Sequence, residues 1–250
     1  MVINKLLNFW ERGDLNMDFI VAKEVYEKLN TVCFGVVVAK GLNNQGVNYE
    51  VEQLLSESVD FIKSKFQTGK IKEALELSPY REAFTRLGIN PNKYMSSIEA
   101  MGSRIIKSGS FPKINPLVDL GNAISLKYLV PLGAHDLDAA NGDIQLRMSK
   151  TGDTFVPFGS EETELLTPGE CIYSAGEVVK TRRWIWRQSE HGKVTDKTRN
   201  VFFPIDGFQD QNYKSIIAAR DELAEQLHRI FSCEVKVGIV DRDNQAFKLN

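Results

Sequence analysis

The sequence predicts an α+β fold, with a mixed and largely antiparallel sheet flanked by helices. Two observations support this class. Between residues 51 and 107, apolar side chains recur at three- and four-residue steps, which is the period of an amphipathic helix. After Gly142 the pattern changes to an alternation of apolar and polar residues, which is typical of strands. Because the 250 residues contain no internal repeat and no Pro/Gly/Ser-rich linker, we expect a single domain over residues 1–250.

The first elements are expected to alternate between strand and helix. Residues 19–21 and the apolar run Val32–Ala39 predict strands, with a short helix over Ala22–Leu29 between them. A longer helix is expected over Val51–Phe66, where one apolar stripe repeats, and Gly69 is expected to end it.

Shorter helices and loop breaks should follow. We expect helices over Ile71–Leu77 and Tyr80–Leu87, separated by a proline that suits a helix start. Ser96 and Glu99 fit a capping box, so a further helix should run to Lys107.

The C-terminal half is predicted to be mainly sheet. A long amphipathic helix over Tyr213–Phe231 should precede a last strand over Glu234–Val240. Five strands are expected before that helix, over Ile144–Met148, Phe155–Phe158, Cys171–Tyr173, Val178–Trp186 and Val201–Ile205.

Composition limits the classes of function. The 31 basic and 33 acidic residues give a net charge of −2, so the chain lacks the general positive charge of proteins that coat nucleic-acid duplexes. No apolar run approaches the roughly 20 residues that cross a bilayer, so we expect no membrane association. Met1–Trp10 has no cleavage site of small residues after it, which argues against a signal peptide and for a cytoplasmic location.

The three cysteines are widely spaced and each lies in an apolar, strand-like run. Cys33, Cys171 and Cys233 are therefore expected to be reduced, buried thiols rather than disulfides or zinc ligands. We expect neither a metal nor a cofactor. The sequence leaves the oligomeric state open.

The stretch from Gly109 to Gly142 places polar side chains among turn-forming residues. Asn115 before a proline suits a helix N-cap, which puts Asn115 and Asp119 near a helix N-terminus that attracts anions, with Asn122 one turn beyond. These residues could line a pocket that binds a substrate. The alternative is a capped helix with an internally hydrogen-bonded Asp119, and for Asn115 alone we favour the cap.

The segment Pro131–Asp138 is expected to form the other wall of this pocket. Gly133 allows close approach of the backbone, and His135 precedes Asp136, so the pair could exchange protons near neutral pH. An Asx turn beside a surface histidine would explain the same residues.

The cluster Arg182–Gln188 is the second unusual feature. Strand alternation would send Arg183 and Arg187 to one face, and Trp184 and Trp186 to the other. Arginine can grip phosphate or carboxylate, and indole rings can stack on bases or pack in a core. Arg183, Trp186, Arg187 and Gln188 are candidates for substrate binding, and the alternative is that the tryptophans lie in the core and the arginines in solvent.

Several spaced segments carry a family resemblance. They are Arg81–Gly88 (REAFTRLG), Ser97–Glu99, Phe111–Asn122 (FPKINPLVDLGN), Pro131–Asp138, Arg182–Gln188 and Thr198–Asp206 (TRNVFFPID). Taken together and in order, these segments resemble the editing domain of the phenylalanyl-tRNA synthetase beta subunit, formed by its third and fourth B modules. The match is closer still to free-standing relatives of that domain, and it covers roughly residues 32–231.

The resemblance implies an α+β domain that hydrolyses the ester joining a wrong amino acid to the terminal ribose of a tRNA. Such a site must hold the ester, place a water and stabilise developing charge, without a metal or a covalent intermediate. Its expected partners are the aminoacylated 3′ end of a tRNA and the amino-acid moiety. Because the catalytic, anticodon-binding and ATP-handling modules are absent from the match, aminoacylation is not expected.

Two departures from the family pattern concern residues tied to tyrosine editing. The synthetase domain typically has a histidine followed by Ala-Phe-Asp, whereas this chain has Gly133-Ala134-His135-Asp136, which displaces the histidine by two residues. The synthetase glutamate after the matching strand is replaced by Pro204, and the nearest acid is Asp206. The identity of the amino acid is therefore left open.

Three hypotheses follow. The first is a trans-acting aminoacyl-tRNA deacylase with His135, Asp136 and Asp206 as candidate catalytic residues. The second is a module that binds RNA or an amino acid without hydrolysis. The third, an unrelated esterase, is disfavoured because the chain shows no Gly-x-Ser-x-Gly elbow and no Cys/His nucleophile pair.

Overall fold

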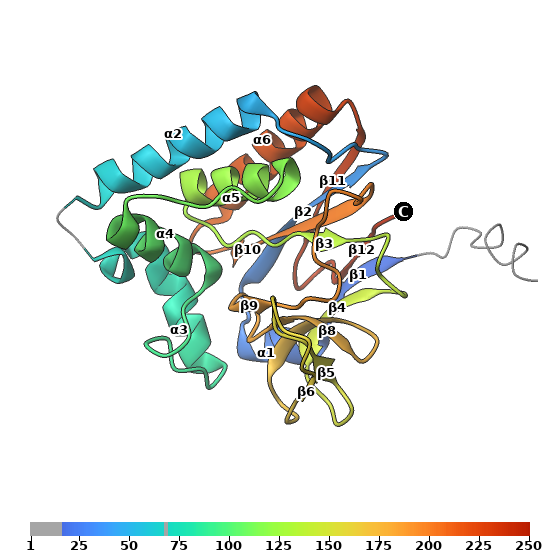
Figure 1. Cartoon of the computed structure of the whole chain (residues 1–250). Helices are drawn as coiled ribbons and strands as arrows, with labels where there is room; N and C mark the ends of the chain where they lie inside the picture. Colours follow the sequence, from blue (N-terminus) through green and yellow to red (C-terminus); the bar gives the residue numbers. More distant parts are fainter. Residues whose placement is uncertain (1–16, 68–69) are drawn as a thin grey trace, which may run out of the picture.

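The computed structural model describes residues 17–67 and 70–250 and shows two stacked sheets with helices packed on the outside (Figure 1). The helices are α1 (Lys23–Lys28), α2 (Tyr49–Lys65), the short 3₁₀ helices η3 (Ile71–Glu73) and η4 (Leu75–Leu77), α3 (Ser78–Arg86), α4 (Ser97–Ser108), α5 (Pro116–Tyr128) and α6 (Tyr213–Phe231).

The strands divide into a larger mixed sheet and a smaller antiparallel one. The larger sheet runs in the order β12 (Ala246–Lys248), β1 (Asp18–Val21), β4 (Ile144–Met148), β7 (Cys171–Ala175), β8 (Val178–Arg182), β5 (Thr154–Phe155) and β6 (Glu164–Leu165), with β9 (Arg187–Gln188) also paired to β8. The smaller sheet runs in the order β11 (Glu234–Val240), β2 (Val32–Lys40), β10 (Val201–Phe208) and β3 (His135–Asp136). Only the pairs β1–β4 and β5–β8 are parallel among the described strand pairs.

The smaller sheet is covered on both faces, which explains why β2 and β10 are apolar almost throughout. Alternate residues of β10 pack into two cores: Phe202 and Phe208 face the larger sheet, whereas Val201, Phe203 and Ile205 face α5 and α6. An aromatic cluster links the two sheets, because Phe19 of β1 contacts the rings of Phe34, Tyr173 and Phe202. Pro204 and Asp206 share the register of Phe202, so they too face the larger sheet.

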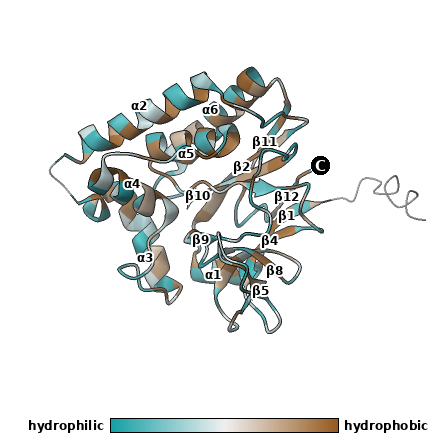
Figure 2. Ribbon diagram, in the orientation of Figure 1, coloured by the Kyte–Doolittle hydropathy of each residue, from teal (hydrophilic) through white to brown (hydrophobic). Residues whose placement is uncertain are grey.

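The outer helices are amphipathic, and α4 is capped by the residue that the sequence indicates. Figure 2 shows hydrophilic and hydrophobic colour alternating along α2, as expected for a helix with one buried face. Ser96 caps α4, where its hydroxyl accepts a hydrogen bond from the Glu99 backbone N–H, and Gly109 ends the helix in a left-handed conformation. None of the helices in the described part of the chain is long and apolar enough to span a membrane.

Most predicted elements are confirmed, with one correction among the helices and three among the strands. The helix predicted over Ile71–Leu77 is two 3₁₀ helices, η3 and η4, with the extended Ala74 between them. The strand predicted over Val178–Trp186 ends at Arg182, and the strand predicted over Phe155–Phe158 is limited to residues 154–155. His135 and Asp136, expected in a loop, form the short edge strand β3 beside β10. The three cysteines are free and buried, as predicted. The expectations for Met1–Trp10 and Gly69 lie outside the described residues.

The close packing of α6 on β10 can be tested at Gly207. A Cβ at this position would lie 2.4 Å from both Cγ1 and Cδ1 of Ile216 and 2.8 Å from the Asn212 side-chain oxygen. We expect Gly207→Ala to lower the free energy of unfolding by about 1–3 kcal/mol through overpacking, measured by urea denaturation. The double variant with Ile216→Ala should lose less free energy of unfolding than the two single variants lose together. Strictly additive losses would contradict the overlap between the added Cβ and the Ile216 side chain.

Candidate functional site

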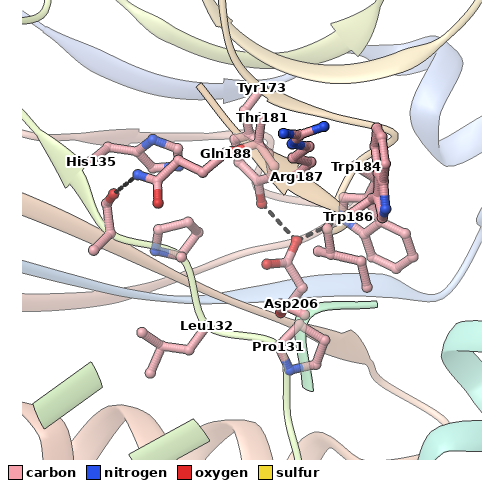
Figure 3. Close-up of a pocket in the computed structure, with 15 residues that line it drawn as sticks. Pro131, Leu132, His135, Tyr173, Thr181, Trp184, Trp186, Arg187, Gln188 and Asp206 are labelled. Atoms are coloured by element: carbon pink, nitrogen blue, oxygen red, sulfur yellow. Dashed lines mark hydrogen bonds between the residues drawn. The ribbon is translucent and has the colours of Figure 1, made fainter. Parts of the chain in front are cut away.

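A small pocket lies between β10, the β8–β9 hairpin and the segment that leads into β3 (Figure 3). We call it the inner pocket, and its volume is about 90 Å³. The segment Pro131–Gly133 is fixed alongside β10, because the Gly133 N–H donates to the Pro204 carbonyl and the Asp206 N–H donates to the Pro131 carbonyl. The inner pocket is lined by Ser97, Pro131–His135, Tyr173, Thr181, Trp184–Gln188, Pro204 and Asp206.

Asp206 forms the polar floor of the inner pocket. Its Oδ1 accepts hydrogen bonds of 2.6 Å from both the Tyr173 hydroxyl and the Trp184 indole N–H. Burial raises the pKa of Asp206 to about 7, although the two donors act in the opposite direction. Figure 3 shows the second carboxylate oxygen directed into the pocket, and none of the hydrogen bonds among the described residues involves it.

The backbone of Asp206 is held as firmly as its side chain. The buried Tyr80 hydroxyl donates to the Asp206 carbonyl at 2.9 Å. Asn212, at the start of α6, donates to the same Tyr80 hydroxyl and accepts from the Phe208 N–H. Helices α3 and α6 therefore fix the position of the pocket floor.

The β8–β9 hairpin turns through two consecutive left-handed residues. Arg183 and Trp184 have φ angles of 47° and 59°, a conformation that costs non-glycine residues of the order of 1 kcal/mol or more each. The turn directs the Trp184 indole, which is fully buried, onto Asp206. The predicted alternation of arginines and tryptophans on two strand faces is therefore wrong, because this segment is a turn rather than a strand.

The turn separates Arg183 from the pocket. Its guanidinium lies 4.0 Å from the centre of the Tyr94 ring and 4.6 Å from that of Trp186, and it also pairs with Glu170 at 3.5 Å. Arg183 thus stabilises the hairpin and does not line the inner pocket. Trp186 and Arg187, by contrast, line the pocket, and the Gln188 side chain donates to the Ala134 carbonyl across it.

His135 lines the inner pocket as a neutral, buried ring. Burial and, to a smaller extent, Lys180 lower the pKa of His135 to about 3. The ring stacks on Phe202 and packs at a tilt against Tyr173, and neither ring nitrogen has a hydrogen-bond partner among the described residues. Buried imidazole nitrogens without partners are uncommon, so these two atoms are polar groups that the described residues leave unsatisfied.

Asp136 does not form the predicted acid–base pair with His135. Adjacent residues of a strand point to opposite faces, and the Asp136 carboxylate accepts from the backbone N–H groups of Asp138 and Ala139 and from the Thr198 hydroxyl. The Asx-turn alternative is confirmed for Asp136, whereas the surface position it implied for His135 is wrong.

Asn115 and Asp119 also lie away from the pocket walls. Asn115 is the N-cap of α5 and accepts from the Val118 N–H, while Asp119 accepts from the Ile114 N–H at 2.9 Å. Burial raises the pKa of the Asp119 carboxyl. Both residues shape the start of α5, and the capping interpretation is confirmed.

The inner pocket opens into a larger groove of about 680 Å³. Ser97, Leu132–Ala134 and Trp186–Gln188 line both, so the two spaces share a junction. The groove is lined by the cations Arg104, Arg187 and Lys193, and its lining in the described chain includes no acidic residue. Asn122, predicted as a binding residue, lies on the wall of this groove.

Several residues of the site were not predicted as binding residues from the sequence. Tyr173, Thr181, Arg104, Lys193 and Phe158 come from ordinary strands, helices or loops, and no local motif distinguishes them. Trp184 was singled out, but without its contact to Asp206. Within residues 17–67 and 70–250, no group of three His, Cys, Asp or Glu side chains could hold a metal ion.

Comparison with known proteins points to one family. The B3/4 domain family matches residues 79–231. The phenylalanine–tRNA ligase beta subunit of Oceanobacillus iheyensis is 29% identical over 181 residues, which are 67% of this chain and 21% of that protein. That of Lactiplantibacillus plantarum is 38% identical over 77 residues, or 30% of this chain and 9% of that protein.

A solved structure is also similar. It is an N-terminal fragment of the phenylalanyl-tRNA synthetase beta subunit from Pyrococcus horikoshii, with a TM-score of 0.48 and 13% identity, covering 90% of this chain and 52% of that one. The chain spans about a fifth or less of the curated ligases that it matches. The family match covers the inner pocket, the groove and the residues that hold Asp206, and the chain belongs to the B3/4 domain family.

Proposed function

We propose that this protein binds the aminoacylated 3′ end of a tRNA and, acting in trans, hydrolyses the ester of a wrongly attached amino acid. One observation carries the proposal: a small pocket with a carboxylate floor opens into a larger groove lined by cations. The two compartments match the two parts of such a ligand, an aminoacyl group and an anionic nucleotide. The ligase beta subunits among its relatives support tRNA as the partner.

The groove offers the groups that single-stranded RNA requires. Arg104 and Arg187 can contact phosphates, and the rings of Phe158 and Trp186 give bases a surface for stacking. Lys193 is paired with Glu190 and lies 5.6 Å from the Phe158 ring, so it reinforces that wall. The net charge of −2 is compatible with this function, because only the end of the tRNA has to be held.

The ester would lie at the junction of the pocket and the groove. An aminoacyl ester is already reactive, so catalysis needs mainly positioning and the orientation of a water. His135 is neutral at physiological pH, and both nitrogens of its ring are buried and unpartnered, so the ring has to shift before one of them accepts a hydrogen bond from that water. Gly133 allows close approach here, since a Cβ would lie 3.2 Å from the Pro204 ring and 3.5 Å from His135 Nε2.

The second candidate is a binding module that holds the same ligand without hydrolysis. The weak basicity of His135 and the structural role of Asp136 favour this alternative over a site with strong general-base catalysis. In both cases we expect no aminoacylation by this chain.

A panel of mischarged tRNAs separates the two candidates. Each tRNA, charged with a radiolabelled amino acid, is incubated with the purified protein, and release of the amino acid is compared with a reaction without protein. We expect release from at least one member of the panel. Saturable binding with no release would select the binding module, and neither binding nor release would reject both.

Salt dependence tests the groove. We expect Arg104→Ala and Arg187→Ala each to weaken tRNA binding and to reduce the slope of log K against log salt by about 1, since each removes one phosphate contact. Arg86→Ala is the matched control, because Arg86 is exposed on α3 outside the groove. If the slope of log K against log salt stayed the same as in the parent protein, neither arginine would contact a phosphate.

The pKa of Asp206 predicts a pH dependence. Because that pKa is raised to about 7, the ionised form that can accept a donor from the substrate accumulates only as the pH rises through about 7. We expect kcat/KM to rise between about pH 6 and pH 8, and this step to be missing in Asp206→Asn. Hydroxide and the titration of the substrate amino group affect the parent protein and Asp206→Asn alike. Identical pH profiles of kcat/KM for the two proteins would therefore show that Asp206 does not cause the rise.

A further inference from the structure

The size of the inner pocket limits what can enter it. A cavity that binds one benzene ring measures about 150 Å³. At about 90 Å³, the inner pocket is smaller than such a cavity. It therefore favours a side chain smaller than the phenol ring of tyrosine.

The polarity of the floor limits the chemistry of that group. Tyr173 and Trp184 both donate to Asp206 Oδ1, which leaves Oδ2 as an acceptor directed into the pocket (Figure 3). Among the described residues that line the inner pocket, the basic one is Arg187, which is at the junction because it lines the groove as well. A carboxylate buried without a cation needs further hydrogen-bond donors.

The remaining walls are mainly apolar. Pro131, Leu132, Ile185 and Pro204 surround the space above the carboxylate. They offer methyl and methylene groups a dry surface but offer no donor to an anionic side chain. The best ligand is therefore short, partly apolar and ends in a hydrogen-bond donor.

The depth of Asp206 indicates which part of an aminoacyl group reaches it. Asp206 lines the inner pocket but not the groove, whereas Ser97, Gly133 and Gln188 line both. The ester and the α-amino group beside it must stay at that junction, because the ribose is held in the groove. The group that extends to the floor is then the side chain.

We infer that the inner pocket selects a small amino-acid side chain that ends in a hydroxyl, as in threonine and serine, and that Asp206 Oδ2 accepts a hydrogen bond from this hydroxyl. This inference rests on the proposed function and names its substrate class. Tyrosine is disfavoured by its size, and valine, which has the shape of threonine, is disfavoured because it leaves Asp206 Oδ2 without a donor.

Asp206→Asn gives a matched variant with a defined geometry. Because two donors converge on the Oδ1 position, the amide oxygen must occupy it, which turns the amide NH₂ toward the pocket. The variant keeps the size of the side chain and the hydrogen bonds of Tyr173 and Trp184. It replaces a charged acceptor on the floor with a neutral donor.

The test uses amide analogues of 3′-aminoacyl-adenosine, which cannot be hydrolysed, and measures their binding by calorimetry. We expect the threonyl analogue to bind 10- to 100-fold more tightly than the valyl analogue, in line with a hydrogen bond to a charged group, and the tyrosyl analogue to bind more weakly than both. In Asp206→Asn, we expect the ratio of threonyl to valyl affinity to fall about tenfold.

The comparison of analogues uses the unaltered protein, so it does not depend on the folding of any variant. Equal affinity for the threonyl and valyl analogues, or tightest binding of the tyrosyl analogue, would overturn the inference while leaving the proposed function standing. If none of the analogues bound, and the panel of mischarged tRNAs showed neither binding nor release, the proposed function would fail and the inference with it.

Discussion

A carboxylate in the middle of a strand that is covered on both faces is the constraint on which the site depends. Asp206 is 1% exposed, and an ionised carboxylate in such a position costs several kcal/mol unless donors surround it. Tyr173 supplies one donor from the facing sheet. Trp184 supplies the other, and it reaches Asp206 because the hairpin turns through two left-handed residues. The strained turn and the buried acid thus stabilise each other.

Charge is separated over a short distance at this site. The groove is lined by Arg104, Arg187 and Lys193, while the inner pocket ends on Asp206. An RNA phosphate is attracted to the groove and repelled by the floor of the pocket, so the arrangement favours one orientation of a nucleotide with an attached small group. The separation also lets a protein of net negative charge present a locally basic surface.

The sequence predicted those elements whose pattern is set by local periodicity. The helices α2, α4 and α6 and the long strands follow from apolar spacing, and the Asn115 cap follows from its place before a proline. The hairpin could not be predicted, because the apolar run Trp184–Trp186 is also typical of a buried strand. The turn is held by tertiary contacts, among them the one between Trp184 and Asp206. His135 and Asp136 suggested a pair by adjacency, although neighbours in a strand point apart. Arg104 lies on a regular helix and joins the site only through the tertiary fold.

The bonding of Asp206 has a consequence for how the protein can diverge. Its carboxylate satisfies two buried donors, so a substitution that changes what the pocket recognises at this position also changes the stability of the whole chain. Leu132 and Ile185 line the same pocket, and their apolar side chains make no hydrogen bonds that a substitution would break. If the pocket binds substrate as proposed, new specificities should therefore arise first in the walls, with the floor retained.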